Sequence, residues 1–123
     1  MIKRFDRLDI ATTDLGDAAA VYAKNFGLTV SRQDSGTQAT IAIGDAQIRL
    51  RSGPEVAELI SSVGEGLAAV WLEADDVEQV AEALRAAGAT MSPIRIEAGR
   101  RILAVAPQAA NLVPLYIFDR RTN

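Results

Sequence analysis

The chain contains neither histidine nor cysteine in its 123 residues. Without cysteine it can form no disulfide and no thiolate site. The sequence also lacks the GxSxG motif of serine hydrolases and any glycine-rich loop with the spacing that cradles phosphate groups. Hydrolase, kinase and thiol-based redox functions therefore lack the residues on which they usually depend.

Long apolar runs and an excess of positive charge are missing as well. The chain has 13 Lys and Arg against 16 Asp and Glu, a net charge of -3, so nothing attracts it to a phosphate backbone or an anionic bilayer. No apolar run approaches the length that spans a bilayer, and the charged start from Met1 to Arg7 is unlike a signal peptide. We expect no nucleic-acid partner, no membrane anchor and, by default, a cytoplasmic location.

The length and composition of the chain are typical of one globular domain. Hydrophobic residues make up 49% and charged residues 24% of the chain, close to ordinary globular usage. A chain of this length removes roughly 65 to 70% of its unfolded surface from water when it folds, enough for one core. We therefore expect a single domain over residues 1–123.

The hydrophobic pattern occurs twice along the chain. In each half a strand-like segment leads into an Asp that can cap a helix, Asp14 or Asp76, and a helical stripe follows that ends near Gly27 or Gly88. Three further strand-like segments complete each half. The predicted strands are 5–12, 28–32, 38–43 and 46–51, then 67–74, 89–93, 101–105 and 113–118. Between the halves, residues 53–66 predict a linker that carries one helical turn.

Each half is therefore predicted to be a βαβββ module, the first at about residues 1–52 and the second at about residues 67–123. Neither half could easily bury its sheet alone. We expect an α+β fold in which the two modules form one curved, mixed eight-stranded sheet with the helices outside.

Short motifs accompany this repeat. Asp14-Leu15 follows the first predicted strand and Phe26-Gly27-Leu28 follows the first helix. The whole pattern resembles the vicinal oxygen chelate superfamily, to which glyoxalase, bleomycin-resistance and extradiol dioxygenase proteins belong. The second half looks most like the methylmalonyl-CoA epimerase branch, through Gly66-Leu67, Asp75-Asp76-Val77, Ala86-Ala87-Gly88, Gly99-Arg100-Arg101-Ile102 and Pro107.

In that superfamily, four side chains on the inner face of the sheet hold a divalent metal. The family spacing places these positions on Arg7, Arg49, Ala69 and Tyr116. A guanidinium group stays protonated, repels a dication and has no lone pair to donate, and alanine has no donor at all. The resemblance thus implies the family fold without its metal ligands, and we expect neither a metal nor another cofactor.

Strand alternation places further polar side chains on or near the same face as these four positions. They are Asp9, Gln47, Arg51, Trp71 and Glu73. Two interpretations stay open. Either Arg7 and Arg49 bind an anionic group, with Gln47, Trp71 and Tyr116 as further ligand contacts. Or the arginines pair with Asp9 and Glu73 and simply fill the space that the metal site leaves.

The residues support three hypotheses about function. The first is metal-independent binding of a small organic molecule, anionic or carbonyl-containing, by a homodimer. The second is a metal-free isomerase, epimerase or lyase for a carbonyl or acyl-CoA substrate, with Asp9 or Glu73 as the base and arginine stabilising an oxyanion. The third is a structural domain that joins a partner through its sheet edges. Arg100 and Arg101, in a predicted hairpin turn, either meet the phosphates of a CoA carrier or are simply solvated.

Overall fold

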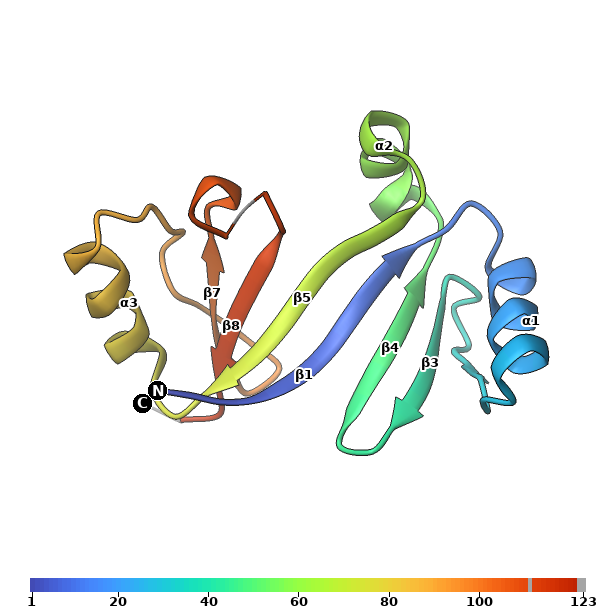
Figure 1. The fold of residues 1–123 in the computed structure, drawn as a ribbon, viewed down its shortest axis with the longest axis horizontal. Coiled ribbons are helices and arrows are strands. Elements are labelled where there is room, and N and C mark those ends of the chain that lie inside the picture. The colour runs from blue at the N-terminus through green and yellow to red at the C-terminus, as the bar shows by residue number, and fades with distance from the viewer. Residues whose placement is uncertain (111, 122–123) are drawn as a thin grey trace. The chain divides into compact units, whose positions relative to one another are not determined.

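The computed structural model describes residues 1–110 and 112–121, and within them it contains three α-helices and eight strands (Figure 1). The helices are α1 (Leu15–Phe26), α2 (Pro54–Val63) and α3 (Val77–Ala86), with a 3-10 turn at Pro107–Ala110. The strands are β1 (Ile2–Ala11), β2 (Ser31–Arg32), β3 (Gln38–Ile43), β4 (Ala46–Arg51), β5 (Gly66–Ala74), β6 (Arg95–Glu97), β7 (Arg100–Val105) and β8 (Leu115–Asp119). The sheet order is β2-β3-β4-β1-β5-β8-β7-β6, with parallel and antiparallel pairs. The predicted α+β class and mixed eight-stranded sheet are confirmed.

The chain forms two compact units. The N-terminal unit comprises residues 7–68, and the C-terminal unit comprises residues 1–6 together with residues 69–123. Strands β1 and β5 each contribute residues to both units. A single domain over the whole chain stays a prediction.

In the N-terminal unit, α1 packs on β3 and β4. Asp14 caps the helix by accepting a hydrogen bond from the Asp17 N–H at 2.9 Å, and Gly27 ends it with a φ of 65°. The stripe of apolar residues on α1 buries Leu15 and Ala19 against the sheet. Its buried partners on the strands are Ala39, Ile41 and Leu50.

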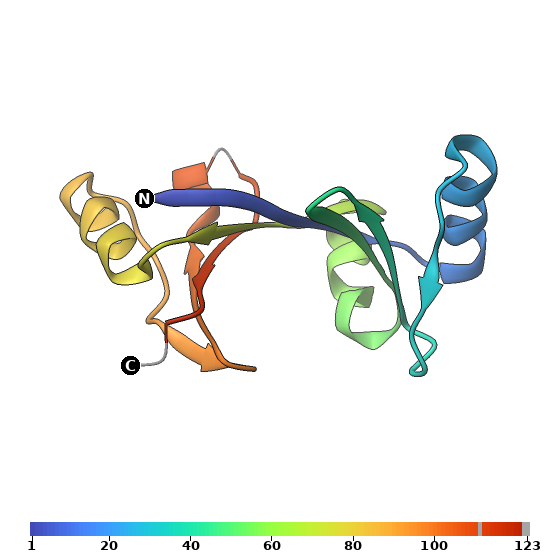
Figure 2. The same cartoon turned by 90° about the horizontal axis from the view of Figure 1, so that it is seen from below.

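In the C-terminal unit, α3 packs on β7 and β8, and Figure 2 shows the helix beside β7. Asp76 caps this helix by accepting a hydrogen bond from the Glu78 N–H at 2.9 Å. The buried cluster on this face consists of Ala74, Val77, Val80, Ala81, Leu103, Val105 and Ile117. Both helices predicted from capped apolar stripes are therefore present.

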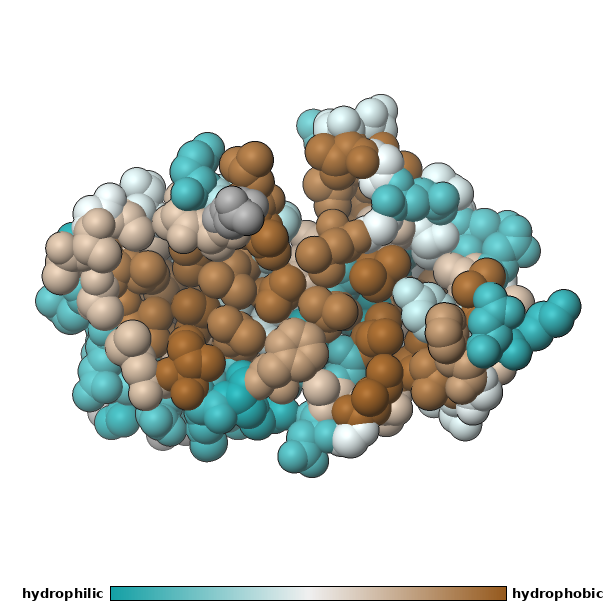
Figure 3. Space-filling model, viewed as in Figure 1, coloured by the Kyte–Doolittle hydropathy of each residue, from teal (hydrophilic) through white to brown (hydrophobic). Residues whose placement is uncertain are grey.

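The segment predicted as a linker contains more helix than the one turn expected, because residues 54–63 form the complete helix α2. Pro54 occupies its first turn, where a missing N–H costs nothing. Val56 is buried against Ala11 and Ala68, so tertiary packing stabilises a helix that its short apolar pattern predicts poorly. Apolar side chains are also exposed on α2 (Figure 3), where Val63 is 70% exposed.

Two predicted strands differ from the structure more than the others do. Residues 89–93 contribute only an isolated bridge between Met91 and Val105, and the strand of this region is β6, from residue 95 to residue 97. Pro93 has no N–H to donate to a ladder, which explains the shift. The strand expected at 28–32 is reduced to β2, which has 2 residues. No helix in the described part of the chain is long and apolar enough to cross a membrane.

Candidate ligand-binding site

The register of β1 and β4 brings charged residues together in the N-terminal unit. The two strands are parallel neighbours, with Arg7 beside Gln47 and Asp9 beside Arg49. The alternating residues, among them Ile10, pack against α1 on the other face. Charged side chains of β1 and β4 therefore share the face that α1 does not cover.

Asp9 is the buried centre of this group, with 0% exposure. Its two carboxylate oxygens accept hydrogen bonds from Arg49, from Nε at 2.7 Å and from Nη2 at 2.6 Å. Arg7 Nε lies 3.9 Å from one oxygen and Arg51 Nη1 lies 3.8 Å from the other. Three guanidinium groups thus surround one carboxylate, and this pairing compensates the large cost of removing its charge from water.

Arg49 keeps donors that Asp9 does not use. A guanidinium group has five N–H donors, and the paired side chain of Arg49 is still 17% exposed. Among the residues that the structure describes, only Asp9 is a hydrogen-bond partner of its side chain. Arg51 differs, because its shortest ion pair, at 2.5 Å, is with Glu55, which is 75% exposed. Asp9 therefore holds Arg49 in a fixed orientation through its Nε and Nη2 groups.

The C-terminal unit has an aromatic cluster on the face opposite α3. Trp71 on β5 stacks on Tyr116 of β8, with ring centroids 4.6 Å apart and an interplanar angle of 15°. The rings of Trp71 and Phe118 form an edge-to-face pair, with ring centroids 6.3 Å apart. Ala69 and Ile102 complete the cluster. Trp71 is only 6% exposed, so most of its ring already lies within the protein.

Glu73 lies beside this cluster and is 5% exposed. Its Oε1 accepts a hydrogen bond from Arg4 Nε at 2.8 Å. Lys3 and Arg120 lie 3.8 and 3.6 Å from Oε2. Of the two carboxylates predicted as partners of Arg7 and Arg49, Asp9 thus contacts both of these arginines, whereas Glu73 pairs with Lys3, Arg4 and Arg120.

The four positions that the sequence assigns to the family's metal do not fit a divalent ion. Arg7 and Arg49 carry positive charge without a lone pair, and Ala69 carries no donor. Tyr116 stacks on Trp71 and is the only one of the four with an oxygen atom in its side chain. Within residues 1–110 and 112–121, no three Asp or Glu side chains gather in a way that could hold a metal.

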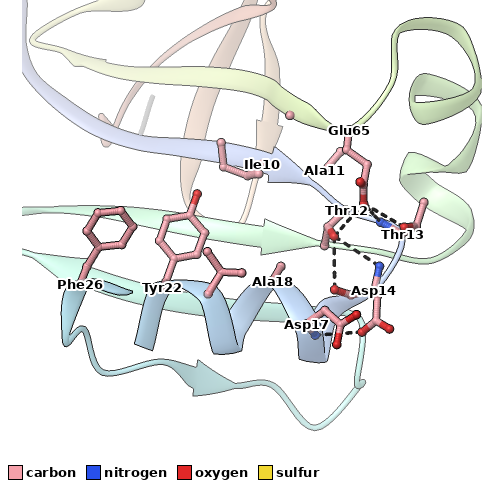
Figure 4. A pocket seen from close by; sticks show the side chains of 12 residues that line it. Ile10, Ala11, Thr12, Thr13, Asp14, Asp17, Ala18, Tyr22, Phe26 and Glu65 are labelled. Carbon is pink, nitrogen blue, oxygen red and sulfur yellow. Dashed lines mark hydrogen bonds between the residues drawn. The ribbon is translucent and has the colours of Figure 1, made fainter. Parts of the chain in front are cut away.

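A groove beside α1, with a volume of about 590 Å³, was not predicted from the sequence (Figure 4). Its apolar part includes Tyr22 and Phe26, and at its other end the Glu65 carboxylate accepts from the Thr13 N–H at 2.7 Å. The hydroxyls of Thr13 and Thr12 also donate to it, at 2.9 and 3.0 Å. These bonds, chiefly the one from the Thr13 backbone, hold the pKa of Glu65 below its ordinary value. Nothing in the sequence indicates this contact, because Glu65 lies between glycines, far from Thr13 along the chain.

The sequence of residues 4–110 matches the Glyoxalase/Bleomycin resistance protein/Dioxygenase superfamily. The chain belongs to this superfamily. The match covers the β1 and β4 residues around Asp9 and also the Trp71 strand. The resemblance stated from the sequence is thereby confirmed. No curated protein matches the sequence.

Several solved structures have the same fold. A Streptomyces coelicolor methylmalonyl-CoA epimerase variant in complex with 2-nitronate-propionyl-CoA has a TM-score of 0.76 at 20% identity, over 97% of this chain and 98% of that one. Methylmalonyl-CoA epimerase from Mycobacterium tuberculosis has a TM-score of 0.75 at 22% identity, over 98% and 89%. A hypothetical protein from Bacillus halodurans C-125 has a TM-score of 0.77 at 20% identity, over 98% and 96%. At these identities the likeness establishes the fold alone.

Proposed function

We propose that the protein binds a small organic molecule that carries an anionic or carbonyl group, and that it does so without a metal. The observation that carries this proposal is the arrangement of Arg49, held by two hydrogen bonds to the buried Asp9 while its side chain stays 17% exposed. A pre-oriented guanidinium group loses little entropy on binding, and its planar fork matches carboxylate and phosphate oxygens.

The other residues predicted to contact the ligand lie in both units, and each unit is considered separately. Arg7 and Gln47 are strand neighbours on the same face as Arg49, and they are proposed to contact the same polar group. In the C-terminal unit, the stacked Trp71 and Tyr116 are proposed to contact a planar or apolar group. A homodimer also stays a prediction, and light scattering on the purified protein tests it.

Thermal unfolding with a panel of candidate ligands tests the proposal. The panel contains short-chain carboxylates, 2-oxo acids, aromatic acids and acyl-CoA thioesters, each with and without EDTA. At least one class should raise the Tm, equally with and without EDTA, and Arg49→Gln should remove the effect. Arg85→Gln is the matched control, because Arg85 is 60% exposed and its ion-pair partner within the described residues is Glu82, also on α3.

Two results would count against this function. If no compound in the panel stabilises the protein, binding of this class is not its activity. If Arg49→Gln responds as the wild type does, Arg49 is not the contact. Stoichiometric zinc, nickel, cobalt or manganese in the purified protein, with binding lost on chelation, would overturn its metal independence.

A metal-free epimerase, isomerase or lyase is the second candidate. It is supported by the fold likeness to methylmalonyl-CoA epimerase, and Asp9 and Glu73 remain the proposed bases. Both are buried and accept hydrogen bonds from arginine, so each would have to exchange an arginine for a substrate proton. Simple binding needs no such exchange and is therefore favoured. Deuterium wash-in at the α carbon of each bound compound is the test, and absence of solvent exchange would end this alternative.

A further inference from the structure

The β7–β8 hairpin places two arginines on the aromatic face of the C-terminal unit. Arg101 pairs with Asp119 and Ile102 with Phe118 across these antiparallel strands, so Arg100 and Arg120 flank the same end of the pair. Since side chains alternate along a strand, Arg100 shares the face of Ile102, and Arg120 shares the face of Phe118. Both arginines therefore lie on the side of the sheet that α3 does not cover.

Both guanidinium groups lie over the same ring. The Arg100 and Arg120 guanidinium carbons are 5.1 and 5.5 Å from the centroid of the Phe118 ring. Arg100 also lies 5.6 Å from the ring of Trp71. Contacts of this length are attractive cation–π interactions, and they restrain side chains that would otherwise be mobile. The two arginines are thereby held close together, although their like charges repel.

The carboxylates nearby do not balance this charge. Glu73 lies 3.6 Å from Arg120, but the same carboxylate also pairs with Lys3 and Arg4. Arg100 has no ion pair with any residue that the structure describes. Its opposite neighbour on β6, Glu97, pairs instead with Arg95 at 3.4 Å. The face of Phe118 is thus a place where positive charge exceeds negative charge.

We propose that Arg100 and Arg120, cross-strand neighbours whose guanidinium groups cover the buried ring of Phe118, together bind a phosphate group of a small molecule. A phosphate monoester carries close to two negative charges at neutral pH, which balances two guanidinium groups, whereas a carboxylate carries one. The planar forks of two arginines also offer enough N–H donors for the phosphate oxygens. This site is built from residues other than Arg49 and goes beyond the function proposed above, so either can fail without the other.

Trp71 provides a direct signal for this test, because it is the only tryptophan and Arg100 lies over its ring. Inorganic phosphate and pyrophosphate are titrated while Trp71 fluorescence and the Tm are followed. Sodium chloride at matched ionic strength and sodium acetate are the reference salts. The wild type should give a saturable response to the phosphates that exceeds the response to both reference salts. Arg100→Gln and Arg120→Gln should each weaken binding at least about tenfold.

Two controls decide the outcome. Arg85→Gln should bind phosphate as the wild type does, because it removes an exposed charge on α3. Arg100→Lys keeps the charge and the fold but loses the planar fork, so its affinity should lie between those of the wild type and Arg100→Gln. The proposal is overturned if chloride or acetate reproduces the phosphate response, or if either glutamine variant binds phosphate with wild-type affinity.

Discussion

Replacing Asp9 should destabilise the protein much more than replacing Arg49. Asp9→Asn leaves the shape of the side chain but removes the buried negative charge around which three guanidinium groups gather. Breaking a buried ion pair in this way costs about 3 to 5 kcal/mol of unfolding free energy, because uncompensated charge stays inside the protein.

Arg49→Gln should cost less. Asp9 then loses its two direct hydrogen bonds, but Arg7 and Arg51 still lie 3.9 and 3.8 Å from its oxygens and can compensate its charge. Each hydrogen bond to a charged group contributes about 1.5 to 3 kcal/mol, and most of what the two lost bonds contributed is recovered when Arg7 and Arg51 move toward the Asp9 oxygens. We therefore expect Asp9→Asn to cost about 2 kcal/mol more than Arg49→Gln.

Urea unfolding followed by far-UV circular dichroism measures both differences, provided that the slope m is unchanged. Glu82→Ala is the control. The side chains of Glu82 and Arg85 are 77% and 60% exposed, so their ion pair should contribute less than about 1 kcal/mol. The reasoning is refuted if Arg49→Gln costs as much as Asp9→Asn. It is also refuted if Asp9→Asn is as mild as the Glu82 control.

Three further predictions concern other parts of the fold. Burial alone would raise the pKa of Asp119, but hydrogen bonds from Arg101 and from backbone N–H groups outweigh it and the pKa is lowered. Asp119 therefore stabilises the fold above its unfolded pKa of about 3.9, and this stabilisation is lost as the pH falls through the lower folded pKa. In urea titrations, Asp119→Asn should be about 3 to 5 kcal/mol less stable than the wild type at pH 7, and its stability should depend less on acid pH. Carbon-detected NMR should find the Glu65 pKa below its ordinary value, and Thr13→Ala should raise it only partly, because the backbone bond is the largest cause; an unshifted Glu65 would contradict this contact. Gly27→Ala should cost about 1 kcal/mol in the same urea assay because φ is 65° there, and a neutral effect would contradict that geometry.

The sequence predicts the regular elements of this fold where local signals agree. Helices α1 and α3 each have an Asp cap and an apolar stripe, and the predicted ranges of β3 and β4 match the observed strands. Helix α2 lacks such agreement, since glycines flank it and its apolar stripe is short. It forms because Val56 is buried against Ala11 and Ala68, and these two residues are distant in sequence. No local pattern contains that contact.

The sequence predicts which face of the sheet the candidate site residues share, but it does not predict all of their ion-pair partners. Alternation along β1 and β4 correctly places Asp9 and Arg49 on one face, and the parallel register makes them neighbours. Glu73 was expected near Arg7 or Arg49 but has Lys3 and Arg4 as partners. The physical reason lies in the first strand, which was predicted from residue 5 and begins at Ile2. Its first residues therefore belong to the sheet, and Lys3 and Arg4 pair with Glu73 from there.

Arg100 and Arg101 are adjacent in the sequence, but their strand positions place them on opposite faces of the sheet. The sequence offers both as turn residues that are solvated or bind phosphate, but Arg101 is only 6% exposed and forms two hydrogen bonds with Asp119, at 2.9 and 2.5 Å. Adjacent strand residues face opposite sides, so Arg101 lies on the α3 side and Arg100 on the side of Trp71. The turn before them, with positive φ at Ala98 and Gly99, 52° and 77°, joins β6 to β7. The pairing of Arg101 with Asp119 across β7 and β8 sets which face each arginine takes, because a shift of one residue in that register would turn Arg101 away from the buried carboxylate.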